Sequence, residues 1–238
     1  TLSALTQGVD SIVGAAQYMI IARILGASGL GTWSAILSLV AIISGFLNLG
    51  LNVPVGRDVA RNKDDTLKLL NVSLGGLLIG PIPLALTSCT ILGWIFAYRS
   101  SDLLAVVLAA VGTAISSLNI LCVAILQALD CFGWNLLLKS ISRIGGLVLL
   151  LTVLLVFPTV TNVFAVNVVS VSFLFVLLIV FLSKSAGPIR PTADWGLGSQ
   201  LILEAIPVTL ASAMATMGMR ADKIILERIS GSTSTGVY

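Results

Sequence analysis

A carboxylate and two amide side chains lie inside the first apolar stretch of this sequence, where polar groups are costly. Gln7 precedes Asp10 by three positions and Gln17 follows it by seven, so the three side chains share one helical face. A carboxylate near the middle of a bilayer costs about 2.5–3.5 kcal/mol on insertion scales. The pattern therefore predicts that Asp10 faces water, a partner or the interior of a helical bundle.

Two interpretations of this polar face remain open. In the functional one, the face lines a cavity and Asp10 binds a cation or a proton. In the other, Asp10 makes a hydrogen bond between helices, or lies nearer to the membrane interface than its position in the apolar stretch suggests.

A second polar face occurs near the end of the sequence. Thr209, Ser212, Thr216 and Arg220 follow helical spacing within another apolar segment. A guanidinium donates a planar fork of hydrogen bonds to oxyanions, which makes Arg220 a candidate for attracting a phosphate. Alternatively, Arg220 extends to the outer headgroups or pairs with Asp222. With Asp10, Gln7 and Gln17, these residues are the candidates for lining a substrate cavity.

The sequence lacks the residue patterns that are typical of catalytic sites and metal sites. It contains no His and only three Cys, and it has no phosphate-binding glycine loop with Lys and Ser/Thr and no Gly-x-Ser-x-Gly motif. An odd number of Cys with no ligand spacing favours small buried side chains. The sequence therefore predicts a protein that is not an enzyme, with no metal site and no cofactor.

The composition is that of a membrane protein. The chain is 57% hydrophobic and 10% charged, with a mean hydropathy of +1.09, whereas a soluble domain is about a quarter charged. Its apolar runs are continuous and approach the ~20 residues that cross a bilayer as a helix, rather than the short alternating segments of a barrel. We therefore predict an all-α, polytopic transmembrane bundle of about seven spans: Leu2–Ala22, Gly31–Val53, Leu69–Ala97, Leu103–Leu129, Ser140–Phe157, Val160–Leu182 and Leu201–Arg220.

The distribution of Lys and Arg predicts the orientation of these spans. Of the 13 Lys and Arg residues, eight fall in the connectors after spans two, four and six: Arg57, Arg61, Lys63, Lys68, Lys139, Arg143, Lys184 and Arg190. Because positive charge accumulates on the cytoplasmic side, we expect a multi-pass protein of the cytoplasmic membrane with its N-terminus inside. This topology accounts for the net charge of +3, so we expect no nucleic-acid partner.

Two segments far apart in the sequence are similar. Arg23–Trp33 and Arg228–Tyr238 place Arg, Ile and two Gly in the same register, and each ends on an aromatic residue. Such a repeat indicates a carrier built by duplication, in which a substrate path lies between the repeats. We therefore predict a six-helix bundle over 1–183, a cytoplasmic connector over 184–200 and the incomplete start of a second bundle over 201–238. Both repeated segments are expected to be loops.

An ordered set of short motifs points to a family. They are Ala22–Trp33, Asn48–Leu51, Arg57–Arg61, Gln127–Leu129, Ala221–Leu226 and Gly236–Tyr238. In these the chain resembles the polysaccharide flippases, which handle O-antigen and other lipid-linked oligosaccharides within the multidrug/oligosaccharidyl-lipid/polysaccharide exporter superfamily. The resemblance implies a carrier of twelve or more helices in two bundles around a central cavity. It also implies a substrate, polyprenyl-pyrophosphate-linked sugar, that is moved from the inner to the outer leaflet.

Three functions are consistent with these observations. The first is a lipid-linked oligosaccharide flippase that works in the bilayer, with a coupling cation and polysaccharide-assembly proteins as further partners. The second is a cation-coupled multidrug antiporter. The third is a membrane scaffold subunit that transports nothing.

Overall fold

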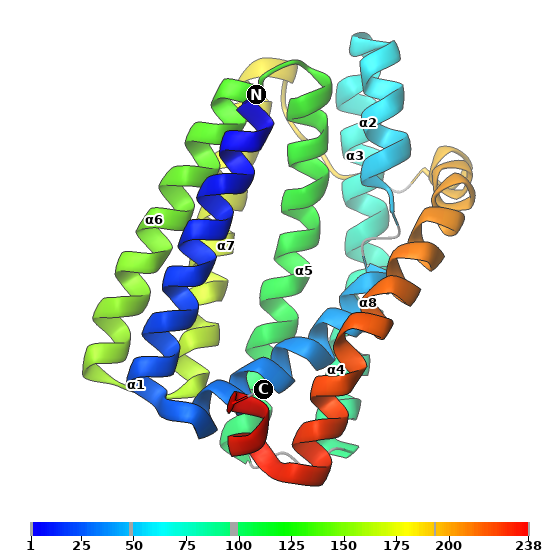
Figure 1. The fold of residues 1–238 in the computed structure, drawn as a ribbon. Helices are drawn as coiled ribbons and strands as arrows, with labels where there is room; N and C mark the ends of the chain where they lie inside the picture. The colour runs from blue at the N-terminus through cyan, green and yellow to red at the C-terminus, as the bar shows by residue number, and fades with distance from the viewer. Residues whose placement is uncertain (1, 48–49, 96–99, 193, 238) are drawn as a thin grey trace.

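The computed structural model of the chain describes residues 2–47, 50–95, 100–192 and 194–237, and the described residues form helices joined by short connectors (Figure 1). The helices are α1 (Leu2–Leu47), α2 (Asn52–Arg61), α3 (Thr66–Ile79), α4 (Pro81–Ile95), α5 (Ser100–Ala128), α6 (Phe132–Val156), α7 (Val160–Ala186) and α8 (Trp195–Val237), with a 3-10 turn at Lys63–Asp65. Six segments of the described chain are long and apolar enough to cross a membrane. The predicted polytopic helical bundle is therefore confirmed.

Helix α1 contains the first predicted span and most of the second, which was expected to reach Val53 whereas α1 ends at Leu47. Its 46 residues measure about 69 Å at 1.5 Å per residue, more than twice the ~30 Å of a bilayer core. The helix is broken only at Gly26, where φ is 71° and ψ is −176°, a conformation that glycine adopts without steric cost. The predicted loop around Gly26 is thus wrong, because a kink at one residue replaces it. Counted as two crossings, α1 brings the total to the predicted seven.

The later repeated segment also lies in a helix rather than in a loop. Helix α8 continues to Val237, and its last part turns across the end of the bundle instead of continuing straight (red in Figure 1). The side chains of residues 220–237 lie outside the part of the chain that is described.

The third predicted span is bent in the middle, as its two prolines indicate. Helix α3 ends at Ile79 and α4 begins at Pro81, with Gly80 between them in a non-helical conformation. Proline lacks the N–H that would continue the ladder of hydrogen bonds, so a helix breaks or bends at this point.

Helix α2 forms where the sequence suggested only a basic connector. Pro54, Val55 and Val59 are buried on one side of it, while Arg57 and Arg61 are exposed on the other. The segment is therefore a short amphipathic helix.

Helix α6 begins earlier than predicted. It starts at Phe132, after the N-cap Cys131, instead of at Ser140, and Asp130 just before the cap is a non-glycine residue with positive φ (62°). Lys139 and Arg143 consequently lie inside a membrane-crossing helix and not in a connector. Helix α8 likewise begins at Trp195 rather than at Leu201.

Helix α5 is the central element of the bundle. In its most apolar stretch 61% of the residues are buried, against 17% for α6 and 22% for α7, so these two helices present much of their surface to the outside of the described bundle. Figure 1 shows α6, α7 and the first part of α1 on one side of α5, and α2, α3, α4 and α8 on the other. One hydrophobic cluster joins α2, α3, α4, α5, α7 and α8, and a second joins α1, α4, α5, α6 and α7.

The N-terminus and the connectors before α3, before α6 and after α7 lie at one end of the bundle (Figure 1). Lys63 Nζ contacts Asp130 Oδ2 at 3.1 Å. The backbone N–H of Arg190 donates to Asn71 Oδ1 at 2.8 Å. The residues between α7 and α8, 187–194, fall within the connector expected at 184–200. The division of the chain into two halves stays a prediction.

Candidate functional site

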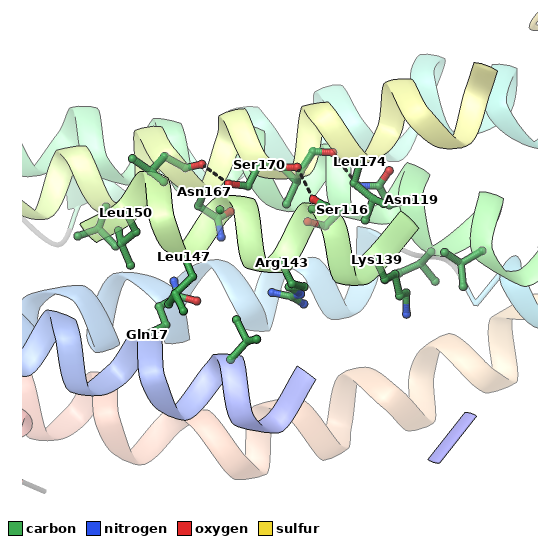
Figure 2. A pocket seen from close by; sticks show the side chains of 18 of the residues that line it. Gln17, Ser116, Asn119, Lys139, Arg143, Leu147, Leu150, Asn167, Ser170 and Leu174 are labelled. Carbon is green, nitrogen blue, oxygen red and sulfur yellow. Dashed lines mark hydrogen bonds between the residues drawn. The ribbon is translucent and has the colours of Figure 1, made fainter. Parts of the chain in front are cut away.

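A polar cavity of about 360 Å³ opens between α1, α5, α6 and α7. Figure 2 shows side chains of these helices around it. Its polar lining residues are Gln17, Asn52, Ser116, Asn119, Gln127, Lys139, Ser142, Arg143, Asn167 and Ser170. Polar groups are costly in the interior of a membrane protein and mark functional paths, so this concentration makes the cavity the candidate site.

An ion pair at the cavity joins α1 to α6. Arg143 Nε lies 3.1 Å from Asp10 Oδ1, and the two side chains are 53% and 33% exposed. Arg143 is near the middle of α6, so its partner Asp10 lies at a similar depth in the bundle. The pairing reduces the cost of holding a carboxylate there, because an unpaired charge at this depth would keep its full desolvation penalty.

Lys139 is the second cation of the cavity. It lies one helical turn before Arg143 on the same face of α6, and both reach the cavity in Figure 2. Within the described part of the chain, Lys139 has neither an ion-pair nor a hydrogen-bond partner, and the same holds for the amides of Gln17, Gln127 and Asn167. These groups are free to bind a ligand.

Other polar groups of the cavity wall join helices to one another. Ser142 Oγ donates to the backbone carbonyl of Ser170 at 2.9 Å, which ties α6 to α7. Asn119 Nδ2 donates to the carbonyl of Val171 at 2.9 Å, which ties α5 to α7. Hydrogen bonds of this kind, together with small residues, hold helices together in lipid. These groups build the wall, and the free cation and amides are left for binding.

The structure brings only some of the predicted residues together. Asp10 contacts Arg143 at the edge of the cavity, and Gln17 lines it. Gln7, in contrast, is exposed and does not line it. The contact of Asp10 is an ion pair between helices α1 and α6, and its role in binding a cation or a proton stays a prediction.

The predicted residues of α8 lie elsewhere. Thr209 is buried and donates to the carbonyl of Ala205 at 2.9 Å, next to the backbone of Gly50. Ser212 and Thr216 donate to carbonyls of their own helix. None of the three lines the cavity. The side chain of Arg220 lies outside the described residues, so its role stays a prediction.

Lys139 and Arg143 are the site residues that the sequence reasoning missed. It assigned both to a cytoplasmic connector and used them for the orientation of the chain. The fifth predicted span, Ser140–Phe157, already contained Arg143, and the apolar residues from Phe132 onwards were the signal that extends it backwards past Lys139. A cation inside a span indicates a functional site, whereas one in a connector indicates orientation.

A second charged cluster joins α2, which lies outside the membrane-crossing segments, to Glu204 in the membrane-crossing part of α8. Arg57 Nη2 lies 2.6 Å from Glu204 Oε2, and Arg57 Nε lies 2.9 Å from Asp58 Oδ1. These hydrogen bonds, that with Asp58 first and that with Glu204 second, raise the pKa of the Arg57 guanidinium above its ordinary value. The cluster fixes the start of α8 against the first part of the chain.

The geometry defines a class of protein: a multi-pass helical membrane protein with a polar, cationic cavity inside its bundle. Such a cavity can bind an anionic or hydroxyl-bearing molecule. Comparison with known sequences gives the family. The chain belongs to the polysaccharide biosynthesis protein family, whose sequence model matches residues 1–238. It is therefore a membrane protein related to polysaccharide synthesis, which confirms the resemblance seen in the sequence.

A solved structure described as protein A has a similar fold. The two superpose with a TM-score of 0.68 at 12% sequence identity, over 99% of this chain and 57% of that chain. At this identity the similarity concerns the fold alone. The present chain thus spans little more than half the length of that protein. No curated protein matches the sequence significantly.

Proposed function

We propose that the protein is a transporter, not an enzyme, and that it flips polyprenyl-pyrophosphate-linked oligosaccharide across the cytoplasmic membrane for the synthesis of cell-surface polysaccharide. The observation that carries the proposal is the pair of cations on one face of α6, Lys139 and Arg143, in a cavity inside an apolar bundle. Family membership supports the link to polysaccharide synthesis.

The cavity suits both chemical parts of such a cargo. Lysine and arginine side chains donate charge-assisted hydrogen bonds to phosphate oxygens. The free amides of Gln17, Gln127 and Asn167 offer both donors and acceptors, which match sugar hydroxyls. The polyprenyl chain stays in the lipid. A coupling cation and polysaccharide-assembly proteins belong to the proposal as further partners.

The two alternative functions have less support. A cation-coupled multidrug antiporter needs a carboxylate that is free to bind its cation, whereas Asp10 is already paired with Arg143. A scaffold that transports nothing gives no reason for a polar cavity inside the bundle.

The end of the bundle that holds the N-terminus is proposed to face the cytoplasm. Arg57, Arg61, Lys63, Lys68, Lys184 and Arg190 lie in or beside the connectors at that end. Among the residues whose side chains are described, only Arg23 lies near the opposite end. The excess of positive charge favours the cytoplasmic side, even after Lys139 and Arg143 are assigned to the cavity.

The proposal is tested by replacing both cavity cations in the full-length protein. A strain that lacks its own flippase is complemented with the unchanged gene or with Lys139→Gln/Arg143→Gln, and its surface polysaccharide is measured. We expect the double variant to lose most of the export, because the cargo's pyrophosphate loses both of its charged partners.

The matched control is Lys63→Gln, which removes a positive charge at the surface. Lys63 is paired with Asp130 and does not line the cavity, so export is expected to stay normal. Normal export by the double variant, at normal protein level in the membrane, would rule out the cavity as the cargo site.

A further inference from the structure

The ion pair between Asp10 and Arg143 places a negative charge at the edge of the cavity. The Asp10 carboxylate lies 3.1 Å from Arg143 Nε, and Arg143 also lines the cavity. The protein's own carboxylate thus occupies part of the guanidinium that an anionic ligand in the cavity would use.

A guanidinium can make two-point contacts with oxyanions through either of two edges. Asp10 is in contact with the edge that carries Nε. An oxyanion arriving from the cavity must therefore use the terminal Nη edge or displace the carboxylate. In both cases the oxyanion lies within a few ångströms of a like charge that weakens its binding.

The charge balance of the cavity also indicates that Asp10 weakens the binding of an anion. Lys139 and Arg143 contribute two positive charges, of which Asp10 offsets one. Without Asp10, a polyanionic pyrophosphate would meet two uncompensated cations in a partly desolvated site. Binding of that kind favours loading and slows release, whereas a transported ligand must bind well enough to enter and weakly enough to leave.

We propose that Asp10 is an internal competitor for Arg143: it lowers the affinity of the cavity for the cargo's phosphate group and thereby sets the rate at which the cargo is released. The proposal rests on the proposed function, because it concerns the same anion site. It assigns Asp10 a role opposite to that of a binding residue. Removing the carboxylate strengthens the binding of an anion and slows transport.

The test measures binding of inorganic pyrophosphate to the full-length protein in detergent, by isothermal titration calorimetry. Asp10→Asn is expected to raise the affinity about tenfold, the size of a like-charge repulsion over several ångströms in a half-exposed site. Arg143→Gln is expected to lower the affinity by a similar factor. In the Arg143→Gln background, Asp10→Asn should give a much smaller gain, because the guanidinium for which it competes is gone.

Two further variants make the result interpretable. Asp10→Ser removes the charge with a smaller side chain, so the test stands if Asp10→Asn does not fold. Asp130→Asn removes a carboxylate from the surface pair with Lys63 and keeps a residue type that tolerates the positive φ of that position. Its affinity should equal that of the unchanged protein.

The transport assay separates competition from a purely structural role. With complementation as the readout, Asp10→Asn should reduce export although it binds pyrophosphate more tightly. A structural defect would instead weaken binding and export together.

The outcomes distinguish this inference from the proposed function. If Arg143→Gln weakens binding but neither Asp10 variant strengthens it, the competitor role is wrong and the anion site stands. If Arg143→Gln leaves binding unchanged, or if no variant binds pyrophosphate, the anion site itself is wrong and the inference fails with it.

Discussion

Two adjacent glycines in α6 give a direct test of how the cavity wall is packed. A Cβ added at Gly146 would lie 2.6 Å from Ser170 Oγ and 3.1 Å from Ser170 Cβ on α7, whereas a Cβ at Gly145 meets nothing within 4 Å. The same substitution, Gly→Ala, therefore acts on a helix contact at one position and on an open surface at the next. Gly145→Ala is the matched control for Gly146→Ala.

The cost of Gly146→Ala follows from these contacts. The Ser170 hydroxyl must rotate away and lose its 2.9 Å hydrogen bond to the carbonyl of Val166, which costs about 0.5–1.5 kcal/mol. The remaining 3.1 Å contact requires α6 and α7 to separate slightly, at a cost at the low end of the ~1–3 kcal/mol typical of overpacking. We expect a net destabilisation of about 0.5–1.5 kcal/mol, because alanine recovers about 1 kcal/mol of this through its higher helix propensity.

The assay is thermal unfolding of the purified protein in detergent. The expected order of midpoints places Gly145→Ala at or above the unchanged protein, and Gly146→Ala below it. Adding Ser170→Gly to Gly146→Ala removes the atoms that clash and should recover part of the lost stability. If Gly146→Ala unfolds at the same temperature as Gly145→Ala, the close approach of α6 and α7 described here is wrong.

The remaining predictions concern the contacts of the first part of the chain with α8 and with the connector before it. The single variants Arg57→Gln and Glu204→Gln should each loosen the contact of α8 with α2, and the charge swap Arg57→Glu/Glu204→Arg should restore this contact. The contact is measured by cross-linking of cysteines introduced into α2 and α8 of a cysteine-free background. Equal cross-linking in all variants would contradict the prediction. Gly75→Ala should displace the backbone of Thr192, which the added Cβ would meet, and so increase hydrogen exchange over 187–194. Gly76→Ala, with open space around it, should not.

The sequence was sufficient to predict the fold class because lipid imposes strong limits. A backbone in a bilayer must satisfy its own hydrogen bonds, so long apolar runs can only be helices. The bend at Gly80–Pro81 was predictable for the same local reason. The boundaries were less reliable. Gly26 was expected in a loop, yet a single residue with positive φ turns the chain.

The candidate site was harder to predict than the fold. Asp10 was recognised because a lone carboxylate in an apolar run is conspicuous. Its partner Arg143 is 133 positions later, and no local pattern connects the two. The error over Lys139 and Arg143 arose because the same residue type indicates orientation in a connector and function in a span. Whether Lys139 indicates orientation or function depends on the residue at which α6 starts. The ends of helices are the least certain part of a sequence-based prediction.

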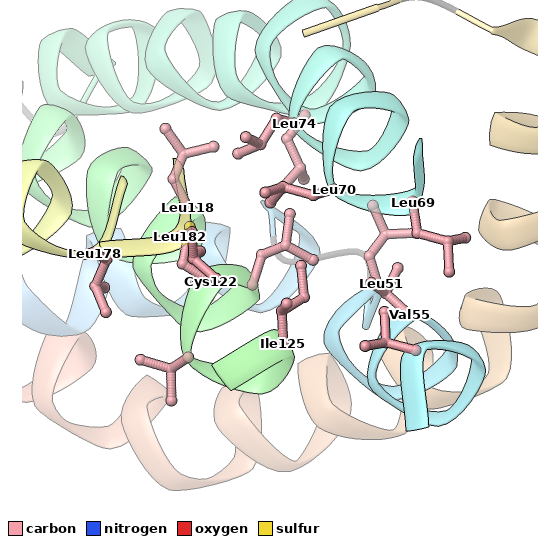
Figure 3. Close-up of a cluster of buried hydrophobic side chains, with 14 of the residues drawn as sticks. Leu51, Val55, Leu69, Leu70, Leu74, Leu118, Cys122, Ile125, Leu178 and Leu182 are labelled. Atoms are coloured by element: carbon pink, nitrogen blue, oxygen red, sulfur yellow. The ribbon is translucent and has the colours of Figure 1, made fainter. Parts of the chain in front are cut away.

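The central position of α5 has a mechanical consequence. Figure 3 shows the cluster that packs Leu118, Cys122 and Ile125 of α5 against Leu70 and Leu74 of α3. The cavity lies where α5 meets α1, α6 and α7. The same cluster includes Leu178 and Leu182 of α7, and Ser142 of α6 is hydrogen-bonded to α7, so a tilt of α6 that widened the cavity would also act on the leucine-rich cluster through α7. The width of the cavity and the packing of α3 against α5 are therefore coupled, and α7 is the helix that contacts both.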